Sequence, residues 1–274
     1  MISTPPENPP SNGRDPYAPA EIAHLVENIG VRKAKIPLLP LVVLGVLAGA
    51  FIAFGAMFFT LSITGSTLGF GPTRLVGGLV FSLGLILVVI AGAELFTGNN
   101  LIVMAWADRK VTTLQLLRNW VIVYIANFVG AAATAVMVVW SGTLDLGDGA
   151  VANTAMAIVE AKVSMPWFEA FVRAILCNAL VCLAIWLSMS AHRVTGKILA
   201  IIFPITAFVA LGFEHSVANM YFLPLGWMLG IDGVTVGAII ANLVPVTIGN
   251  IVGGSIFVAL VYWLVYLRPD SNPE

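Results

Sequence analysis

Six long apolar stretches decide what this chain can fold into. They cover residues 37–64, 74–107, 114–141, 168–191, 198–229 and 234–267. About 20 apolar residues are enough for a helix to cross the hydrocarbon core of a bilayer, where the backbone must satisfy its own hydrogen bonds. Of the 274 residues, 59% are hydrophobic and only 10% are charged, against about 25% charged residues in a soluble domain. The sequence therefore predicts an all-α integral membrane protein with six transmembrane helices.

The basic residues predict how these helices are oriented. Ten of the 13 Lys and Arg fall on the same side as the N-terminus, and the positive-inside rule places that side in the cytoplasm. We expect a multi-pass protein of the cytoplasmic (inner) membrane with both termini in the cytoplasm. Because the basic residues are scattered and form no basic face, they indicate no nucleic-acid partner.

The segments outside the spans divide the chain further. Residues 1–17 contain five prolines and predict a disordered tail, and residues 268–274 form a short C-terminal tail. Residues 18–36 have apolar side chains at helical spacing and predict an amphipathic cytoplasmic helix. This helix could lie on the membrane lipid, pack against a neighbouring subunit or remain solvated. Residues 37–267 form the transmembrane domain.

Two of the six stretches are interrupted by polar residues. Residues 93–99 and 212–219 each place an Asn five positions after a Glu in the middle of apolar sequence. An ionisable group at that depth costs roughly 2.5 to 3.5 kcal/mol and normally faces a protein interior or a water-filled path. Both stretches are longer than one crossing needs, which is typical of a discontinuous helix.

The two interruptions also suggest internal symmetry. Each lies in the middle span of a set of three, with the first set over residues 37–141 and the second over 165–267. Three is odd, so the two sets must have opposite orientations. This arrangement is an inverted repeat, which places a transport site near the midplane between the broken helices.

The polar groups at these interruptions suit a small anion. The half-helix after each break presents free N–H groups at the positive end of its dipole. Thr97 adds a hydroxyl, and His215 adds an imidazole. Modest changes in the environment of an imidazole decide whether it is charged. Glu214 next to it could stabilise a histidine cation or orient the break, and we favour the second role. The alternative is a purely structural pair, in which Glu214 caps the break and a backbone carbonyl satisfies His215.

Other functional classes find little support. The sequence has no H-E-x-x-H motif, no Cys pair at metal-ligand spacing and no nucleophile in a G-x-S-x-G context. Cys177 and Cys182 are five apart in one apolar run, where a helix directs them too differently for a disulfide. We therefore expect no enzyme activity, no metal and no cofactor.

Three segments resemble the formate/nitrite transporter family of microbial anion channels. They are residues 93–99 (AELFTGN), 177–184 (CNALVCLA) and 212–220 (GFEHSVANM). The resemblance covers nearly the whole membrane domain, in order and at suitable separations. It implies an aquaporin-like fold of six helices and a homopentamer with one substrate pore in each subunit.

Carried over by motif position, the resemblance also implies roles for single residues. Thr97 and His215 would form the central polar pair. Asn178 and Glu214 would support the histidine, and Lys162 would be the cation of the outer vestibule. The apolar constrictions on either side of the pair would be formed by Leu85, Leu95, Phe96, Val181 and Phe208.

The expected substrate is a small monovalent anion, with formate as the leading candidate. In the mechanism that the resemblance implies, a weak monocarboxylate passes the apolar constriction after it gains a proton, from His215 or from bulk water. Nitrite and hydrosulfide remain alternatives because related proteins handle them with much the same motifs. A neutral-solute pore for water or glycerol would need Asn-Pro-Ala at each break, and the Asn-Pro pairs here lie in the tails. A scaffold or receptor has no support beyond the N-terminal tail.

Overall fold

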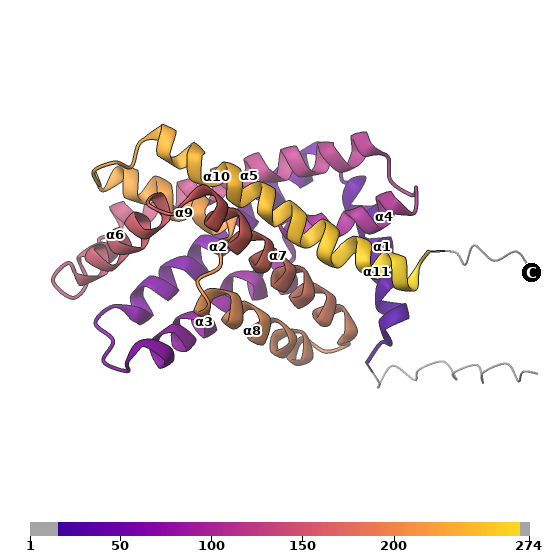
Figure 1. Cartoon of the computed structure of the whole chain (residues 1–274), viewed down its shortest axis with the longest axis horizontal. Helices are drawn as coiled ribbons and strands as arrows, with labels where there is room; N and C mark the ends of the chain where they lie inside the picture. Colours follow the sequence, from indigo (N-terminus) through magenta and orange to yellow (C-terminus); the bar gives the residue numbers. More distant parts are fainter. Residues whose placement is uncertain (1–15, 269–274) are drawn as a thin grey trace, which may run out of the picture.

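The structure, a computed structural model, describes residues 16–268, and every regular element in this range is a helix (Figure 1). Residues 1–15 and 269–274, which hold most of the two expected tails, lie outside the described residues. Tyr17 donates its N–H to the carbonyl of Ser190 at 3.1 Å, and its ring lies 4.3 Å from that of His192. The amphipathic helix α1 then runs from Pro19 to Ala34.

Five helical runs within the described range are long and apolar enough to cross a membrane. They are α2 (Leu38–Ile63), α3 with its π-helical end (Phe70–Gly92), α5 (Thr113–Trp140), α7 (Trp167–Ser190), and α10 with η4 and α11 (Val236–Tyr266). The fifth expected span is divided into α8 (Val194–Ala210) and α9 (Ser216–Met228), so neither part alone has the necessary length. The expected all-α membrane architecture is confirmed.

Both expected interruptions are real breaks in the helices. After α3 (Phe70–Leu87) and η1 (Val88–Gly92), the chain is non-helical until the 3-10 helix η2 (Gly98–Ile102), which leads into α4 (Val103–Ala107). The second break separates α8 from α9. Gly92 (φ +84°) and Gly212 (φ +74°) turn the chain out of the preceding helix in the left-handed region, where glycine has no steric penalty.

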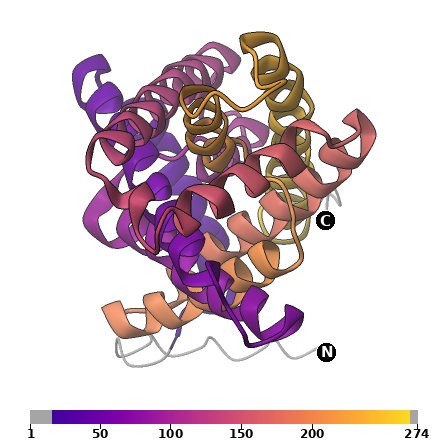
Figure 2. The ribbon, with the colours of Figure 1, turned by 90° about the vertical axis from the view of Figure 1, so that its left-hand side faces the viewer.

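Short helices lie at both ends of the molecule. The long connection between the third and fourth spans contains η3 (Thr143–Asp145) and α6 (Ala150–Val163), which packs against α9. Figure 1 places α6 at one end, and α1, α4 and α11 (Val261–Tyr266) together at the other. Figure 2 looks along the molecule from the α6 end. The helix α6 is a finding that the sequence analysis did not anticipate.

Glycines allow the long helices to approach at backbone distance. A Cβ on Gly49 of α2 would lie 2.1 Å from the carbonyl oxygen of Asn127 on α5. A Cβ on Gly249 of α10 would lie 2.4 Å from the carbonyl oxygen of Phe171 on α7. The contacts α2 with α5 and α7 with α10 therefore depend on residues without side chains, as is usual between membrane helices.

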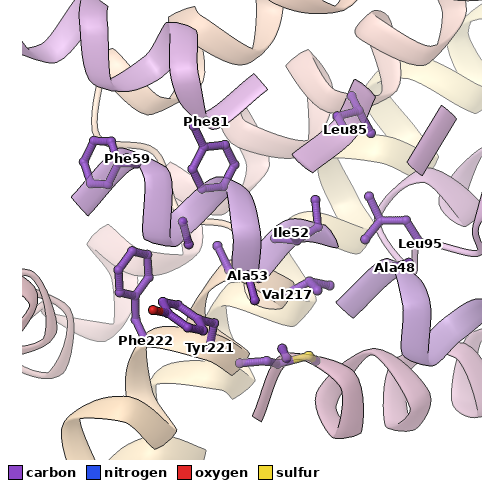
Figure 3. Close-up of a cluster of buried hydrophobic side chains, with 14 of the residues drawn as sticks. Ala48, Ile52, Ala53, Phe59, Phe81, Leu85, Leu95, Val217, Tyr221 and Phe222 are labelled. Carbon is purple, nitrogen blue, oxygen red and sulfur yellow. The ribbon is translucent and has the colours of Figure 1, made fainter. Parts of the chain in front are cut away.

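The apolar core surrounds both breaks. Its largest cluster includes side chains of α2, α3, α7, α8 and α9. Figure 3 shows side chains from different elements meeting here, among them Ile52, Phe81, Leu85 and Leu95. The polar residues of the breaks are consequently held among apolar neighbours, where each polar group needs a partner inside the protein.

Candidate permeation site

The two breaks meet at one hydrogen bond. Thr97 Oγ1, in the first break, lies 3.0 Å from Nε2 of His215, in the second. Both side chains are buried, at 0% and 3% exposure. Residues 118 positions apart in the chain therefore form a single polar point inside the apolar core.

The helix that follows the second break fixes the proton arrangement of His215. His215 is the N-cap residue of α9, and its Nδ1 accepts the backbone N–H of Ala218 at 3.1 Å. An acceptor nitrogen carries no hydrogen, so a neutral His215 has its proton on Nε2 and donates it to Thr97 Oγ1. The Thr97 hydroxyl hydrogen then remains available to another acceptor, because the described residues provide none.

An apolar constriction lies directly beside this pair. A void of about 10 Å³ is bordered by His215 and by Ile52, Phe81, Leu85, Leu95, Val181, Ile205 and Phe208. A space of this size holds about one water molecule. The ring of Phe208 stacks on the imidazole with centroids 5.9 Å apart. Four of the five expected constriction residues are brought together here.

A cavity of about 360 Å³ lies on one side of the constriction, and we call it the Lys162 cavity. It shares Phe81, Phe208 and His215 with the constriction. Lys162 lies in the last turn of α6, and its Nζ contacts Glu214 Oε1 at 2.8 Å. The expected vestibule lysine is therefore placed at the wall of a cavity that reaches the central histidine.

Glu214 is held from two directions. Asn219 Nδ2 donates to Glu214 Oε2 at 2.7 Å and to Asn242 Oδ1 at 2.8 Å, and Asn242 Nδ2 donates to the carbonyl of Lys162 at 2.9 Å. These bonds tie α6, α9 and α10 to the second break. The carboxylate of Glu214 thus contacts Lys162 and Asn219 and makes no described hydrogen bond to the imidazole.

A second cavity of about 300 Å³ lies on the other side of the constriction, and we call it the Lys33 cavity. It shares Leu95 with the constriction. Lys33 Nζ donates to Glu94 Oε1 at 2.7 Å and to Asn99 Oδ1 at 3.1 Å. Asn99 Nδ2 donates to Glu94 Oε2 and to Asn119 Oδ1, and Asn119 Nδ2 donates to the carbonyl of Lys33. This network repeats the Lys162 network except for one bond: within the described residues Asn219 Oδ1 has no hydrogen-bond partner, whereas Asn99 Oδ1 accepts Lys33.

The equivalence extends to the residues that hold each break. Asn127 Nδ2 donates to the carbonyl of Glu94 at 2.9 Å, and Asn127 Oδ1 accepts the N–H of Phe96, two residues after Glu94, at 2.9 Å. Asn250 does the same at Glu214, with distances of 3.0 and 2.9 Å. Such pairs are what the expected inverted repeat requires.

Two of the expected site residues lie elsewhere. Asn178 Nδ2 donates to the carbonyls of Thr97 (3.2 Å) and Asn250 (2.7 Å) and to Asn100 Oδ1 (2.7 Å), so it supports the Thr97 break and makes no described bond to His215. Phe96 borders none of the three cavities, because its ring packs edge-on against Trp120 and Tyr124.

Lys33 is the one cation among the described residues that line the Lys33 cavity, and the sequence analysis did not single it out. A signal for it was present. Asn119 and Asn127 are eight residues apart, as are Asn242 and Asn250, and each pair follows a Glu–Asn pair at a spacing of five. Because the second set binds a lysine, a lysine should have been sought for the first.

A family model described as formate/nitrite transporter matches residues 20–264, a range that contains both breaks and both cavities. The chain belongs to the formate/nitrite transporter family. The family assignment expected from the three motifs is confirmed, and the relatives are channels and transporters, not enzymes.

Similar proteins cover nearly the whole chain. A probable formate transporter of Methanothermobacter thermautotrophicus is 45% identical over 269 residues, which are 92% of this chain and 97% of the relative. The formate channel FocA of Escherichia coli K12 is 39% identical over 280 residues, covering 95% and 98% of the two chains.

Solved structures of the family have the same fold. A pentameric formate channel with formate bound superposes with a TM-score of 0.78 at 38% identity, over 84% of this chain and 98% of that one. A channel described as an FNT family ion channel gives a TM-score of 0.81 at 31% identity, over 89% and 98%. The chain is thus a multi-pass membrane protein with the architecture of this family.

Proposed function

We propose that this protein is a channel for small monovalent anions, with formate as its principal substrate. The observation that carries the proposal is the Thr97–His215 hydrogen bond at the constriction between two cavities, each with a lysine in its wall. Lysines attract anions, the constriction excludes hydrated ions, and the central pair places a polar contact beside the constriction. The formate channels among the relatives favour formate.

The size and polarity of the constriction favour passage as a neutral acid. An unpaired ion in an apolar, water-free space is penalised far more strongly than a neutral molecule, so a permeating carboxylate gains by taking up a proton. We propose that a weak acid such as formate is drawn in as an anion beside Lys162 or Lys33 and crosses the constriction protonated. Flux should therefore increase as the pH falls.

His215 has a defined part in this scheme. A proton on Nδ1 would break the hydrogen bond that Nδ1 accepts from the N–H of Ala218. The fold therefore favours the neutral imidazole with its proton on Nε2. We propose that Nε2–H and the Thr97 hydroxyl contact the permeating molecule at the midpoint, and that the proton it carries comes from the water of the cavities. The apolar ring around them is formed by Leu85, Leu95, Val181 and Phe208.

The orientation and assembly are also proposals. We place the Lys33 cavity and both termini on the cytoplasmic side of the cytoplasmic membrane, because most basic residues lie on that side. We propose a homopentamer, as in the related pentameric formate channel. Many large apolar side chains are exposed on the long helices, among them Leu114, Ile125 and Phe257, and they suit lipid or neighbouring subunits.

A flux assay on purified protein in proteoliposomes tests the substrate. Formate, nitrite and hydrosulfide are compared at about pH 5.5 and 7.5, because the protonated fraction of a weak acid changes over this range. We expect rapid formate flux that is higher at the lower pH. Preference for nitrite or hydrosulfide would support an anion channel but would replace formate as the principal substrate. Permeation of water or glycerol without any anion flux would contradict the proposal.

A further inference from the structure

The Lys162 cavity and the Lys33 cavity differ in the number of cationic side chains that line them. Arg74 of α3 and Arg173 of α7 line the Lys162 cavity together with Lys162, against the single carboxylate of Glu214. The lining of the Lys33 cavity has one lysine and one glutamate. The positive charge in excess of the lysine–glutamate pair is therefore confined to one end of the channel.

Both arginines are aimed at the chain just before the second break. Arg74 Nε donates to the carbonyl of Ala210 and its Nη2 to that of Val209, both at 2.9 Å. Arg173 Nη1 donates to the carbonyl of Gly212 at 3.1 Å. A Cβ built on Gly212 would lie 3.0 Å from Arg74 Nη2 and 3.4 Å from Arg173 Nη1, so the two guanidinium groups converge on one spot.

These contacts leave charge and hydrogen-bond donors unused. Within the described residues Arg74 has no carboxylate within 4 Å, and Arg173 pairs only with Glu169, which is 44% exposed and sits one turn earlier on the same helix. A guanidinium has five N–H donors, and Arg74 uses two of them here. Two neighbouring guanidinium groups repel each other, and an anion between them removes that repulsion.

We propose that Arg74 and Arg173 form an anion-capture site in the Lys162 cavity, separate from Lys162 and from the central Thr97–His215 pair. It would bind a small monovalent carboxylate, because a planar guanidinium fork matches a carboxylate better than an ammonium does. This inference rests on the proposed anion transport, and it predicts that the concentration dependence of transport differs between the two sides of the membrane. The permeability at low concentration must be equal in both directions, but half-saturation occurs at a lower concentration on the side of the arginines.

The test is the concentration dependence of initial formate uptake into right-side-out and inside-out membrane vesicles at fixed ionic strength. Arg173→Met should raise the half-saturating concentration about threefold in the vesicles that expose the Lys162 cavity, a size typical of a partly exposed charge contact. The opposite vesicles should show little change. Arg173→Lys, which retains the charge, should recover much of the difference.

Glu169→Gln gives a prediction of opposite sign. It removes the carboxylate that competes for Arg173, so half-saturation on the same side should occur at a lower concentration. A purely structural role of the arginine would not produce this gain, and the variant keeps both arginines if Arg173→Met fails to fold. Unchanged half-saturation in Glu169→Gln, or equal shifts in both vesicle orientations, would overturn the capture site. Absence of formate flux in the wild type would instead overturn the proposed function.

Discussion

His215 both caps a helix and contacts Thr97, and two substitutions separate these roles. Its Nδ1 caps α9 by accepting the N–H of Ala218, and its Nε2 contacts Thr97 at the constriction. In His215→Asn the side-chain oxygen can still cap the helix, but the Nε2 contact is lost. His215→Phe loses both. Because both variants lose the Nε2–H donor at the midpoint, we expect both to carry less formate than the wild type at every pH between about 5 and 8.

Stability distinguishes the two variants further. His215→Phe should lower the free energy of unfolding by about 1 kcal/mol through the lost cap, whereas His215→Asn should stay close to the wild type. The two measurements are the flux profile in proteoliposomes and thermal unfolding in one detergent. A wild-type flux profile in His215→Asn would refute the role of the imidazole in permeation.

At this scale the sequence predicted the residues that carry unusual chemistry. His215 stood out because it is the one histidine in the centre of an apolar stretch, and Thr97 because it lies in the polar interruption at residues 93–99. The partners of Asn178 could not be predicted in the same way, because its amide bonds depend on the close approach of α7, η2 and α10. Lys33 was hidden because it lies in the amphipathic helix, where basic residues are common.

At the scale of single elements, α1 is attached by a buried carboxylate. Glu27 is 1% exposed; its Oε2 accepts Lys110 Nζ at 2.7 Å, and its Oε1 has no hydrogen-bond partner among the residues that the structure describes. Asp108 lies 3.0 Å from the same ammonium and accepts Trp263 Nε1 at 3.4 Å. Burial, with a contribution from Asp108, raises the pKa of the Glu27 carboxyl against the opposing effect of Lys110. A proton on the Glu27 carboxyl would let it donate to Asp108.

The sign of this shift makes α1 a pH-dependent element. Docked Glu27 holds its proton more tightly than undocked Glu27, so docking gains stability as the pH falls through the raised pKa and loses it as the pH rises. We expect stronger amide-exchange protection of α1 at about pH 5.5 than at 7.5, after correction for intrinsic exchange. Glu27→Gln should abolish the difference, because its amide can donate to Asp108 at any pH. The exposed Glu21→Gln is the matched control, and persistent pH dependence in Glu27→Gln would count against this explanation.

This element borders the path as well. Val26, Ile29, Gly30 and Lys33 of α1 form part of the wall of the Lys33 cavity. The docking of α1 therefore affects the wall of this cavity.

The helix crossings give a prediction about stability. Gly49→Ala places a methyl group 2.1 Å from the carbonyl oxygen of Asn127, so α2 and α5 must separate. We expect a loss of about 1–3 kcal/mol, the usual cost of overpacking. Gly71→Ala in the first turn of α3 meets nothing within 4 Å and is the control. Equal thermal unfolding midpoints for the two variants would show that the crossing tolerates expansion.

The elements differed in how far the sequence could predict them. The long helices followed from length and hydropathy, and the breaks from charged residues in apolar surroundings. The helix α6 was not anticipated, because its 14 residues are too short to span a membrane and were read only as part of the connection between two spans. Its position against α9 brings Lys162 to Glu214, and that contact forms only in the folded protein.

At the scale of the whole molecule, two similar half-sites face each other across one constriction. Each lysine is bound to a glutamate and each break is held by an asparagine, so the two cavities present similar groups on either side of the constriction. The arginine pair then makes the two ends unequal. The symmetry was predictable from the repeated Glu–Asn spacing, whereas the asymmetry required the positions of side chains from α3 and α7.

The most direct test of this account is whether a proton crosses with formate. Formate is added outside proteoliposomes that contain a pH-sensitive dye and a membrane-potential dye. Passage of the neutral acid predicts acidification of the lumen in proportion to formate uptake and no membrane potential. A membrane potential, negative inside, that develops with formate uptake while the lumen keeps its pH would mean that the bare anion crosses the constriction, and it would contradict the account.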